Sequence, residues 1–128
     1  MPSAILVAVV LGAAVGRAQP APLPADVRVM AAPASALAPR NSDASVAVLR
    51  DGTLMMVDGR FLAGLDDDDD SDLLAITSSD GGQHWSAPRT VVERDARSMV
   101  MSPSLLRLAT GELALVYARK RSPDDCAM

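Results

Sequence analysis

A self-similarity at an offset of 59 residues limits what this chain of 128 residues can fold into. Residues 45–60 recur as residues 104–119, and six of the sixteen positions are identical: Ser45/Ser104, Leu49/Leu108, Gly52/Gly111, Leu54/Leu113, Val57/Val116 and Arg60/Arg119. Each copy holds two apolar, β-prone arms joined at a turn, which is Asp51-Gly52 in the first copy and Thr110-Gly111 in the second. The repeat therefore predicts two related pairs of antiparallel strands.

A second constraint is the octet at residues 78–85, which reads S-x-D-x-G-x-x-W. The Ser78 hydroxyl and the Asp80 carboxylate can bond to nearby backbone groups and hold a tight turn closed. Gly82 supplies a positive φ without a steric clash, and Trp85, the single Trp of the chain, can pin the turn to the strands beneath it. Apolar, extended segments flank the octet, so we predict that it is a hairpin turn.

On Ser78, Asp80, Gly82 and Trp85, the octet resembles the Asp-box of the sialidase (neuraminidase) superfamily. In that family the box is structural, joins the outer strands of a β-propeller blade and lies away from the active site. The resemblance implies an all-β fold made of antiparallel blades. Propellers of other functions carry the same box, so it supports a fold more than a reaction.

The repeat length fits this architecture, because a propeller blade contains four antiparallel strands. We predict strands at residues 45–50, 53–60, 73–77 and 87–92 for one blade, and at 104–108 and 112–119 for the next, with no helix after the leader. We interpret the chain as an N-terminal fragment with about one and a half blades of a six-bladed sialidase-like propeller. A complete small β-sandwich is the alternative, although a sandwich gives no reason for the repeat.

The first 39 residues differ in composition from the rest. Residues 4–16 are apolar or small, and Gly16-Arg17-Ala18 places small residues where a signal peptidase cleaves, so we predict a signal peptide at residues 1–18 and a secreted or periplasmic protein. The apolar run is too short for a membrane span, and an Ala-rich disordered leader is the alternative. Five prolines interrupt residues 19–39, which we interpret as a linker before the incomplete propeller domain at residues 40–128.

The charge of the chain excludes one class of partner. It contains 12 Lys and Arg against 16 Asp and Glu, for a net charge of −4, and it has no basic stripe, so nucleic acid is not an expected partner. The acidity is concentrated at residues 66–70 and Asp72, but the spacing of an EF-hand loop is absent and no metal is predicted. No P-loop or dinucleotide fingerprint is present, so no cofactor is expected. The single Cys126 cannot form an internal disulfide.

Two arginines are candidates for substrate binding through the resemblance. Sialidases carry an Arg near the first strand that binds the substrate carboxylate, usually before Ile-Pro, and Arg40 occupies this place before Asn-Ser. A planar guanidinium can bind a carboxylate with two parallel hydrogen bonds. Met99 stands at the position of Arg40 in the second repeat, which favours function over a solvated end of the linker. Arg60 matches a second family Arg by position, but Arg119 repeats it, so a structural role in every blade is equally open.

The family's general acid/base follows the second Arg on a loop over the propeller centre, and here that loop spans residues 62–71. Such an acid protonates the leaving glycosidic oxygen, which requires a raised pKa, and neighbouring carboxylates raise it. The spacing favours Asp67, with Asp66 and Asp68 as rivals, and a solvated charged loop is the competing interpretation. The family's nucleophile, a Tyr polarised by a Glu, comes from later blades, so we interpret Tyr117 as a strand residue.

The resemblance, which covers about residues 40–126, implies the N-terminal part of a secreted exo-alpha-sialidase-like glycoside hydrolase. The full protein would release terminal sialic acid from glycoconjugates by a retaining mechanism, whereas the fragment alone is expected to be inactive. Sialylated or related glycans are the expected partners. The alternative is a non-catalytic Asp-box propeller that binds glycans or protein, which needs the blade repeat but not the arginines.

Overall fold

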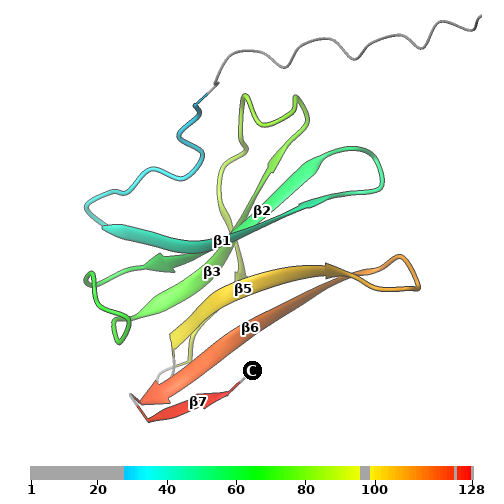
Figure 1. Cartoon of the computed structure of the whole chain (residues 1–128). Helices are drawn as coiled ribbons and strands as arrows, with labels where there is room; N and C mark the ends of the chain where they lie inside the picture. Colours follow the sequence, from blue (N-terminus) through cyan, green and yellow to red (C-terminus); the bar gives the residue numbers. More distant parts are fainter. Residues whose placement is uncertain (1–27, 96–98, 123, 128) are drawn as a thin grey trace, which may run out of the picture.

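The computed structural model describes residues 28–95, 99–122 and 124–127, and within these residues the fold is all-β with no helix (Figure 1). Seven strands follow one another along this part of the chain: β1 Arg40–Val48, β2 Leu54–Phe61, β3 Ser71–Ser78, β4 Arg89–Val92, β5 Met99–Arg107, β6 Leu113–Ser122 and β7 Asp125–Ala127. No helix that could cross a membrane occurs among these described residues.

The strands form two antiparallel sheets. The first sheet has the order β1-β2-β3-β4, and the second has the order β5-β6-β7. Within each sheet, strands that follow one another along the chain are neighbours, and each pair is antiparallel. This order follows from the short connections, which can join antiparallel neighbours but are too short for the crossover that parallel strands need.

The six strands predicted from the sequence are confirmed, and so is the absence of a helix in residues 45–92. Strand β7 was not predicted, and the observed β1 and β5 begin about five residues before the predicted strands. The predicted signal peptide, residues 1–18, lies outside the described residues. Of the predicted linker, residues 28–39 are described, and they contain only an isolated bridge between Ser35 and Ala38.

The 59-residue repeat of the sequence is also a repeat of backbone geometry in β1 and β5. A bulge interrupts β1 after Ser42, and a bulge interrupts β5 after Met101, at the equivalent position. Within these bulges Asp43 and Ser102 adopt positive φ angles of 55° and 51°. The residues before each bulge remain paired with the neighbouring strand, so β1 and β5 begin earlier in the sequence than the apolar alternation predicts.

The turns that follow these strands match as well. Gly52 and Gly111 have φ angles of 86° and 85°, a region in which a residue with a side chain is strained. The Gly52 N–H donates to the carbonyl of Leu49 at 3.1 Å, and the Gly111 N–H donates to the carbonyl of Leu108 at 2.9 Å. The β1/β2 hairpin and the β5/β6 hairpin are therefore copies of one another in bulge and turn.

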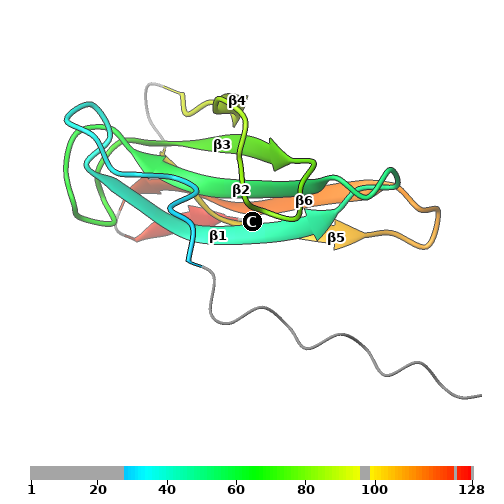
Figure 2. The same ribbon diagram turned by 90° about the horizontal axis from the view of Figure 1, so that it is seen from above.

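The two sheets pack face to face, as Figure 2 shows from above. Residues from both sheets form the core: Val57, Leu73, Ala75 and Val100 make the buried cluster, and Leu105, Leu115 and Tyr117 of the second sheet pack against it. Because side chains alternate along a strand, these residues define one face of each sheet. At the edge of this core, the buried Ser71 hydroxyl donates to the carbonyl of Val100 at 2.8 Å.

The first strands of the two sheets, β1 and β5, also contact one another. The Ser102 hydroxyl donates to Oδ2 of Asp43 at 3.0 Å, and the Leu105 N–H donates to Oγ of Ser45 at 3.0 Å. Asp43 and Ser102 are separated by 59 residues, so they are equivalent positions of the repeat. The second sheet is thus placed against the first as one repeat against the next.

Candidate functional site

Arg40 begins β1, and its guanidinium contacts a carboxylate, a backbone carbonyl, the hydroxyl of Ser42 at 3.4 Å and an aromatic ring. Nη2 lies 2.6 Å from Oδ1 of Asp67, and Nη1 donates to the carbonyl of Leu65 at 2.6 Å. Cζ stands 4.3 Å from the ring centroid of Phe61, which is fully buried. Phe61 is the cross-strand partner of Arg40, so the register of β1 and β2 places the ring beneath the cation. The structure thus brings together two predicted site residues, Arg40 and Asp67.

Asp67 lies in the loop between β2 and β3 and remains accessible to solvent. Its side chain is 63% exposed, so a ligand could reach it without any rearrangement of the sheet. The loop has an internal clasp, because the Asp69 carboxylate accepts the Asp66 N–H at 2.8 Å. Gly64 permits this clasp, since a Cβ at that position would collide with the Asp69 carboxylate.

Individual carboxylates of the acidic run at residues 66–70 contact basic side chains from separate segments of the chain. Lys120 of β6 bonds to Asp68, whereas Arg94 lies 3.3 Å from Asp70 and 3.1 Å from Asp72. The backbone N–H of Arg94 also donates to Asp72 at 2.9 Å. Neighbouring carboxylates therefore face different cations, and no group of His, Cys, Asp or Glu among the described residues is arranged to hold a metal ion.

Arg60 extends from the opposite face of the sheet. Its cross-strand partner is Asn41, and strand alternation places both on the other side from Arg40 and Phe61. Nε of Arg60 donates to Oδ1 of Asn41 at 3.2 Å, and the Asn41 amide donates in turn to the carbonyl of Ala32 at 2.8 Å. Arg60 thus helps to attach the segment before β1 to the sheet, and it does not converge with Arg40 on Asp67.

Asp58 is a buried acid that sequence analysis did not identify. It is 2% exposed, and neither carboxylate oxygen has a hydrogen-bond partner among the described residues. Nη2 of Arg60 lies 3.9 Å from its Oδ2. Burial raises the pKa of the Asp58 carboxyl, and the charge of Arg60 opposes this rise.

The predicted hairpin turn is confirmed, since the octet lies in the connection between the antiparallel strands β3 and β4. Oγ of Ser78 accepts the Gly82 N–H at 2.9 Å and donates to Oδ1 of Asp80 at 2.8 Å. The same carboxylate oxygen accepts the N–H groups of Gln83 and His84, both at 3.0 Å. One hydroxyl and one carboxylate oxygen therefore satisfy three consecutive backbone donors.

The surroundings of Asp80 and Trp85 show that the octet is built as a turn. The His84 backbone N–H and ring, with Nδ1 2.6 Å from Oδ2 of Asp80, and the Ser78 hydroxyl hold the pKa of the Asp80 carboxyl far below its usual range. Nε1 of Trp85 donates to the carbonyl of Gly82 at 3.0 Å. With these bonds the Asp80 carboxylate is committed to the backbone of its own loop.

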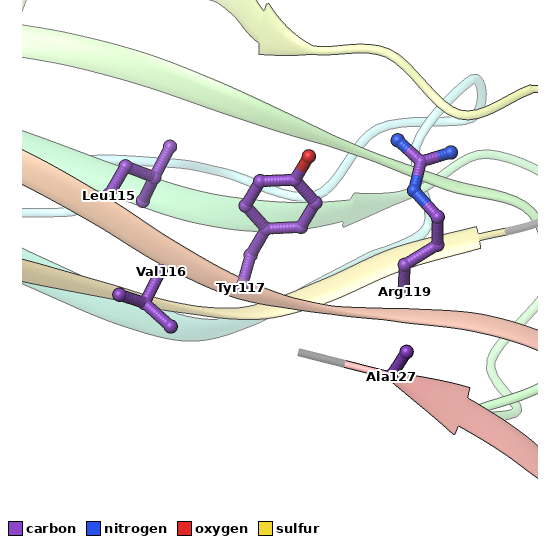
Figure 3. Close-up of a pocket in the computed structure, with 5 residues that line it drawn as sticks. All are labelled: Leu115, Val116, Tyr117, Arg119 and Ala127. Carbon is purple, nitrogen blue, oxygen red and sulfur yellow. The ribbon is translucent and has the colours of Figure 1, made fainter.

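A pocket of about 390 Å³ lies beside β6. Figure 3 shows five residues that line it: Leu115, Val116, Tyr117, Arg119 and Ala127. Leu115, Tyr117 and Arg119 project from one side of the strand, as alternate residues do. A hydrogen bond with Tyr117 raises the pKa of the Arg119 guanidinium, which also lies 2.8 Å from Asp95. Tyr117 packs against the core, which confirms its interpretation as a strand residue.

No protein-family model matches this chain, and no curated protein matches its sequence. A function must therefore be argued from the motifs and from the geometry of the described residues.

Three residues that shape the candidate site were missed by sequence analysis: Phe61 beneath Arg40, and Arg94 and Lys120 on the acidic run. Phe61 could have been noticed, because it is the single Phe of the chain and directly follows a predicted strand. No local signal identifies Arg94 or Lys120, since each reaches the loop from a segment that is distant in the sequence.

Proposed function

We propose that this chain is part of a secreted or periplasmic sialidase-like β-propeller that hydrolyses terminal sialosides. One observation supports this proposal above all: Arg40 and Asp67 come from different segments and lie 2.6 Å apart at one end of the first sheet. They are the guanidinium and the carboxyl that the resemblance assigns to substrate binding and proton donation. The Asp-box hairpin and the repeated β1/β2 and β5/β6 hairpins support the propeller part of the proposal.

The distance between Arg40 and Asp67 suits a sugar whose carboxylate is attached to the anomeric carbon. We place the substrate carboxylate on the side of the guanidinium that the Asp67 carboxylate contacts in the structure. A sialic acid that binds Arg40 with two parallel hydrogen bonds displaces Asp67. The displaced Asp67 then stands beside the leaving glycosidic oxygen, which departs from the same carbon, as the candidate proton donor.

The nucleophilic part of the reaction is not assigned to any described residue. In the family a Tyr polarised by a Glu attacks the anomeric carbon, whereas Tyr117 hydrogen-bonds Arg119 and packs against the core. We therefore expect the isolated chain to bind sialic acid without turning over a sialoside.

A second function is favoured by the way in which Arg40 is held. Its guanidinium bonds to the carbonyl of Leu65 and lies over the ring of Phe61, and these contacts fix the acidic loop to β1. A non-catalytic Asp-box propeller that binds glycans or protein requires only this scaffold. In that case Arg40 is a structural residue.

Binding of free sialic acid to the purified chain, measured by titration calorimetry, distinguishes the two functions. Asp67→Asn removes the competing charge and keeps the side-chain size, so the sialidase-like site should bind sialic acid several-fold more tightly. Arg40→Ala should abolish this binding, and Arg40→Lys should weaken it because the planar fork is lost. The methyl ester of sialic acid, which lacks the charge, is the control ligand and should respond to none of these changes. Equal binding by all four proteins would favour the non-catalytic propeller.

Export is tested separately by mass spectrometry of the protein that its native host secretes. Cleavage after Ala18 should leave Gln19 as the N-terminal residue. Recovery of the chain from the cytoplasm with Met1 intact would contradict the predicted signal peptide.

A further inference from the structure

Five consecutive aspartates form the acidic run at residues 66–70, and by side-chain type each of them could pair with Arg40. Blocks of like charge repel one another and tend to be disordered, so contacts from outside the run are needed to order it. In the structure Arg40 pairs with one member of the run, Asp67. The neighbouring contacts of the loop show how this carboxylate is selected.

Three of the five aspartates are restrained by a clasp within the loop and by Arg94. The Asp66 N–H donates to Oδ2 of Asp69 at 2.8 Å, and the Asp66 carbonyl accepts the Asp69 N–H at 3.2 Å. The carboxylate of Asp70 lies 3.3 Å from Nε of Arg94. The two middle members of the run, residues 67 and 68, carry adjacent carboxylates that these contacts do not distinguish.

Lys120 distinguishes the two middle carboxylates, because its Nζ bonds to Asp68. Lys120 belongs to β6, the central strand of the second sheet, and pairs with Met99 on one side and Cys126 on the other. Its side chain is 16% exposed, whereas that of Asp68 is 56% exposed. The packed sheet therefore sets the position of the cation, and the more exposed loop meets it at the end of the sheets where β6 ends (Figures 1 and 2).

Further ion pairs connect the strand that carries Lys120 to the base of the acidic loop. Arg119, the residue before Lys120, lies 2.8 Å from Asp95. Arg94, the residue before Asp95, lies 3.1 Å from Asp72 at the start of β3. The second sheet thus holds the loop both at its middle, through Lys120, and at its end, through the segment that connects the two sheets.

We propose that Lys120 is a positioning residue that selects Asp67 as the carboxylate on Arg40 by binding Asp68. Without this cation, Asp68 is released and competes with Asp67 for the same guanidinium, because adjacent residues are only about 3.8 Å apart along the backbone. The second repeat thereby determines which acid of the first repeat lies in the candidate site. The effect on sugar binding rests on the proposed function, whereas the selection of Asp67 does not.

A test without ligand follows the Nε–Hε NMR signal of Arg40 in the full chain, which is identified by its absence from Arg40→Lys. In the unmodified chain, Asp67→Asn should shift this signal and Asp68→Asn should leave it in place. Lys120→Met keeps an unbranched side chain and removes the charge. In this variant both aspartate substitutions should shift the signal, because both carboxylates then contact Arg40.

Two controls separate the contact of Lys120 from its charge. Lys120→Arg keeps the cation and should restore the pattern of the unmodified chain. Arg121→Met removes a positive charge from the exposed next residue of β6 and should leave that pattern unchanged. Lys120→Gln replaces Lys120→Met if the latter does not show the circular dichroism spectrum of the unmodified chain. The proposal is overturned if Asp68→Asn shifts the Arg40 signal equally with and without Lys120, or in neither case.

Titration calorimetry with free sialic acid connects this selection to ligand binding. In the unmodified chain, Asp67→Asn should tighten binding about two- to fivefold, the range that a partly exposed ion pair supports. In Lys120→Met the same substitution should give roughly half of this gain or less, because Asp68 then occupies Arg40, and replacing both aspartates by Asn should restore the gain. A gain that is the same with and without Lys120 would overturn the positioning role. Absence of sialic acid binding in every variant contradicts the proposed function alone, because the NMR signal still reports which aspartate contacts Arg40.

Discussion

Asp58 and Arg60 point to the same face of β2, and Nη2 of Arg60 stops 3.9 Å from Oδ2 of Asp58, which is beyond hydrogen-bond distance. Neither oxygen of Asp58 has a hydrogen-bond partner among the described residues. In the second repeat Tyr117 occupies the position of Asp58 and makes a hydrogen bond with Arg119, so the hairpin does not require an acid here. A buried charge that is incompletely paired lowers the stability of the fold.

Asp58→Asn should therefore stabilise the protein at neutral pH. Burial raises the pKa of Asp58 in the folded state above its ordinary value of 3.8. The folded protein therefore tolerates the protonated carboxyl below pH 3.8, and its free energy of unfolding falls as the pH rises through the folded pKa and the carboxyl becomes charged. The variant should gain about 1–3 kcal/mol at pH 7 and much less at pH 3.5. Urea unfolding at both pH values measures the difference, and an equal gain at both would show that charge is not its cause.

Ser78→Ala should destabilise the turn formed by residues 78–85. Ser78 is 2% exposed, and its hydroxyl accepts the Gly82 N–H and donates to Asp80, so its removal leaves a backbone donor unsatisfied. We expect a loss of about 1–3 kcal/mol in the free energy of unfolding, measured with urea. Ser79→Ala, at the exposed neighbouring position, is the control and should change stability by less than about 0.5 kcal/mol. Equal effects of the two substitutions would refute the structural role of the Ser78 hydroxyl.

Asp80→Asn should lower the melting temperature in a manner that depends on pH. The hydrogen bonds from His84 hold the pKa of Asp80 below 3.8 in the folded state, so the stabilisation is present above 3.8 and is lost as the pH falls through the folded pKa. The difference in melting temperature between the variant and the unmodified chain should have its full size above about pH 5 and should shrink toward pH 2. Circular dichroism melts over this range measure it. Sialic acid binding should stay unchanged, and a loss of binding without a change in melting would mean that the turn is itself a binding site.

The strands could be predicted because their signals are local. The turns at Gly52 and Gly111 and the flanking apolar arms mark β1, β2, β5 and β6, and the repeat supports each assignment with a second copy. The starts of β1 and β5 could not be predicted, because the bulges are formed at Asp43 and Ser102, where residues with side chains adopt positive φ. Only the pairing with the neighbouring strand compensates such strain, and that pairing is not visible in the local sequence.

The candidate site could be predicted only in part, for the same reason. The sequence singled out Arg40 and Asp67 separately, but their contact depends on the register that places Arg40 over Phe61 and on the path of the acidic loop. Arg60 is next to Phe61 in the sequence, yet a difference of one position along β2 puts it on the opposite face of the sheet. A predicted strand gives the alternation of side chains, but it does not say which face meets the loop.

The contact between Arg40 and Asp67 leads to a prediction about stability. Arg40→Ala should lower the free energy of unfolding by about 1–2 kcal/mol, mainly because the cation over the buried Phe61 ring is lost. Asp67→Asn should have a smaller effect, because its carboxylate is 63% exposed and exposed ion pairs contribute little. Urea unfolding of both variants and of the double variant should give a coupling energy of about 0.2–1 kcal/mol.

The salt dependence of this coupling energy distinguishes a substrate-binding role of Arg40 and Asp67 from a structural one. A pair that opens to admit a substrate carboxylate must be weak and screened by solvent. The coupling energy should therefore fall toward zero as NaCl is raised from about 0.05 to 1 M, because the screening length shortens by about threefold or more over this range. Arg40→Lys paired with Asp67→Asn is the matched cycle, since Lys keeps the charge and loses the planar fork. A coupling that stays above about 2 kcal/mol in 1 M NaCl would identify Arg40 and Asp67 as a fixed structural bracket, because such a pair would be too strong for an exposed ion pair and would not release Asp67 to a leaving glycosidic oxygen.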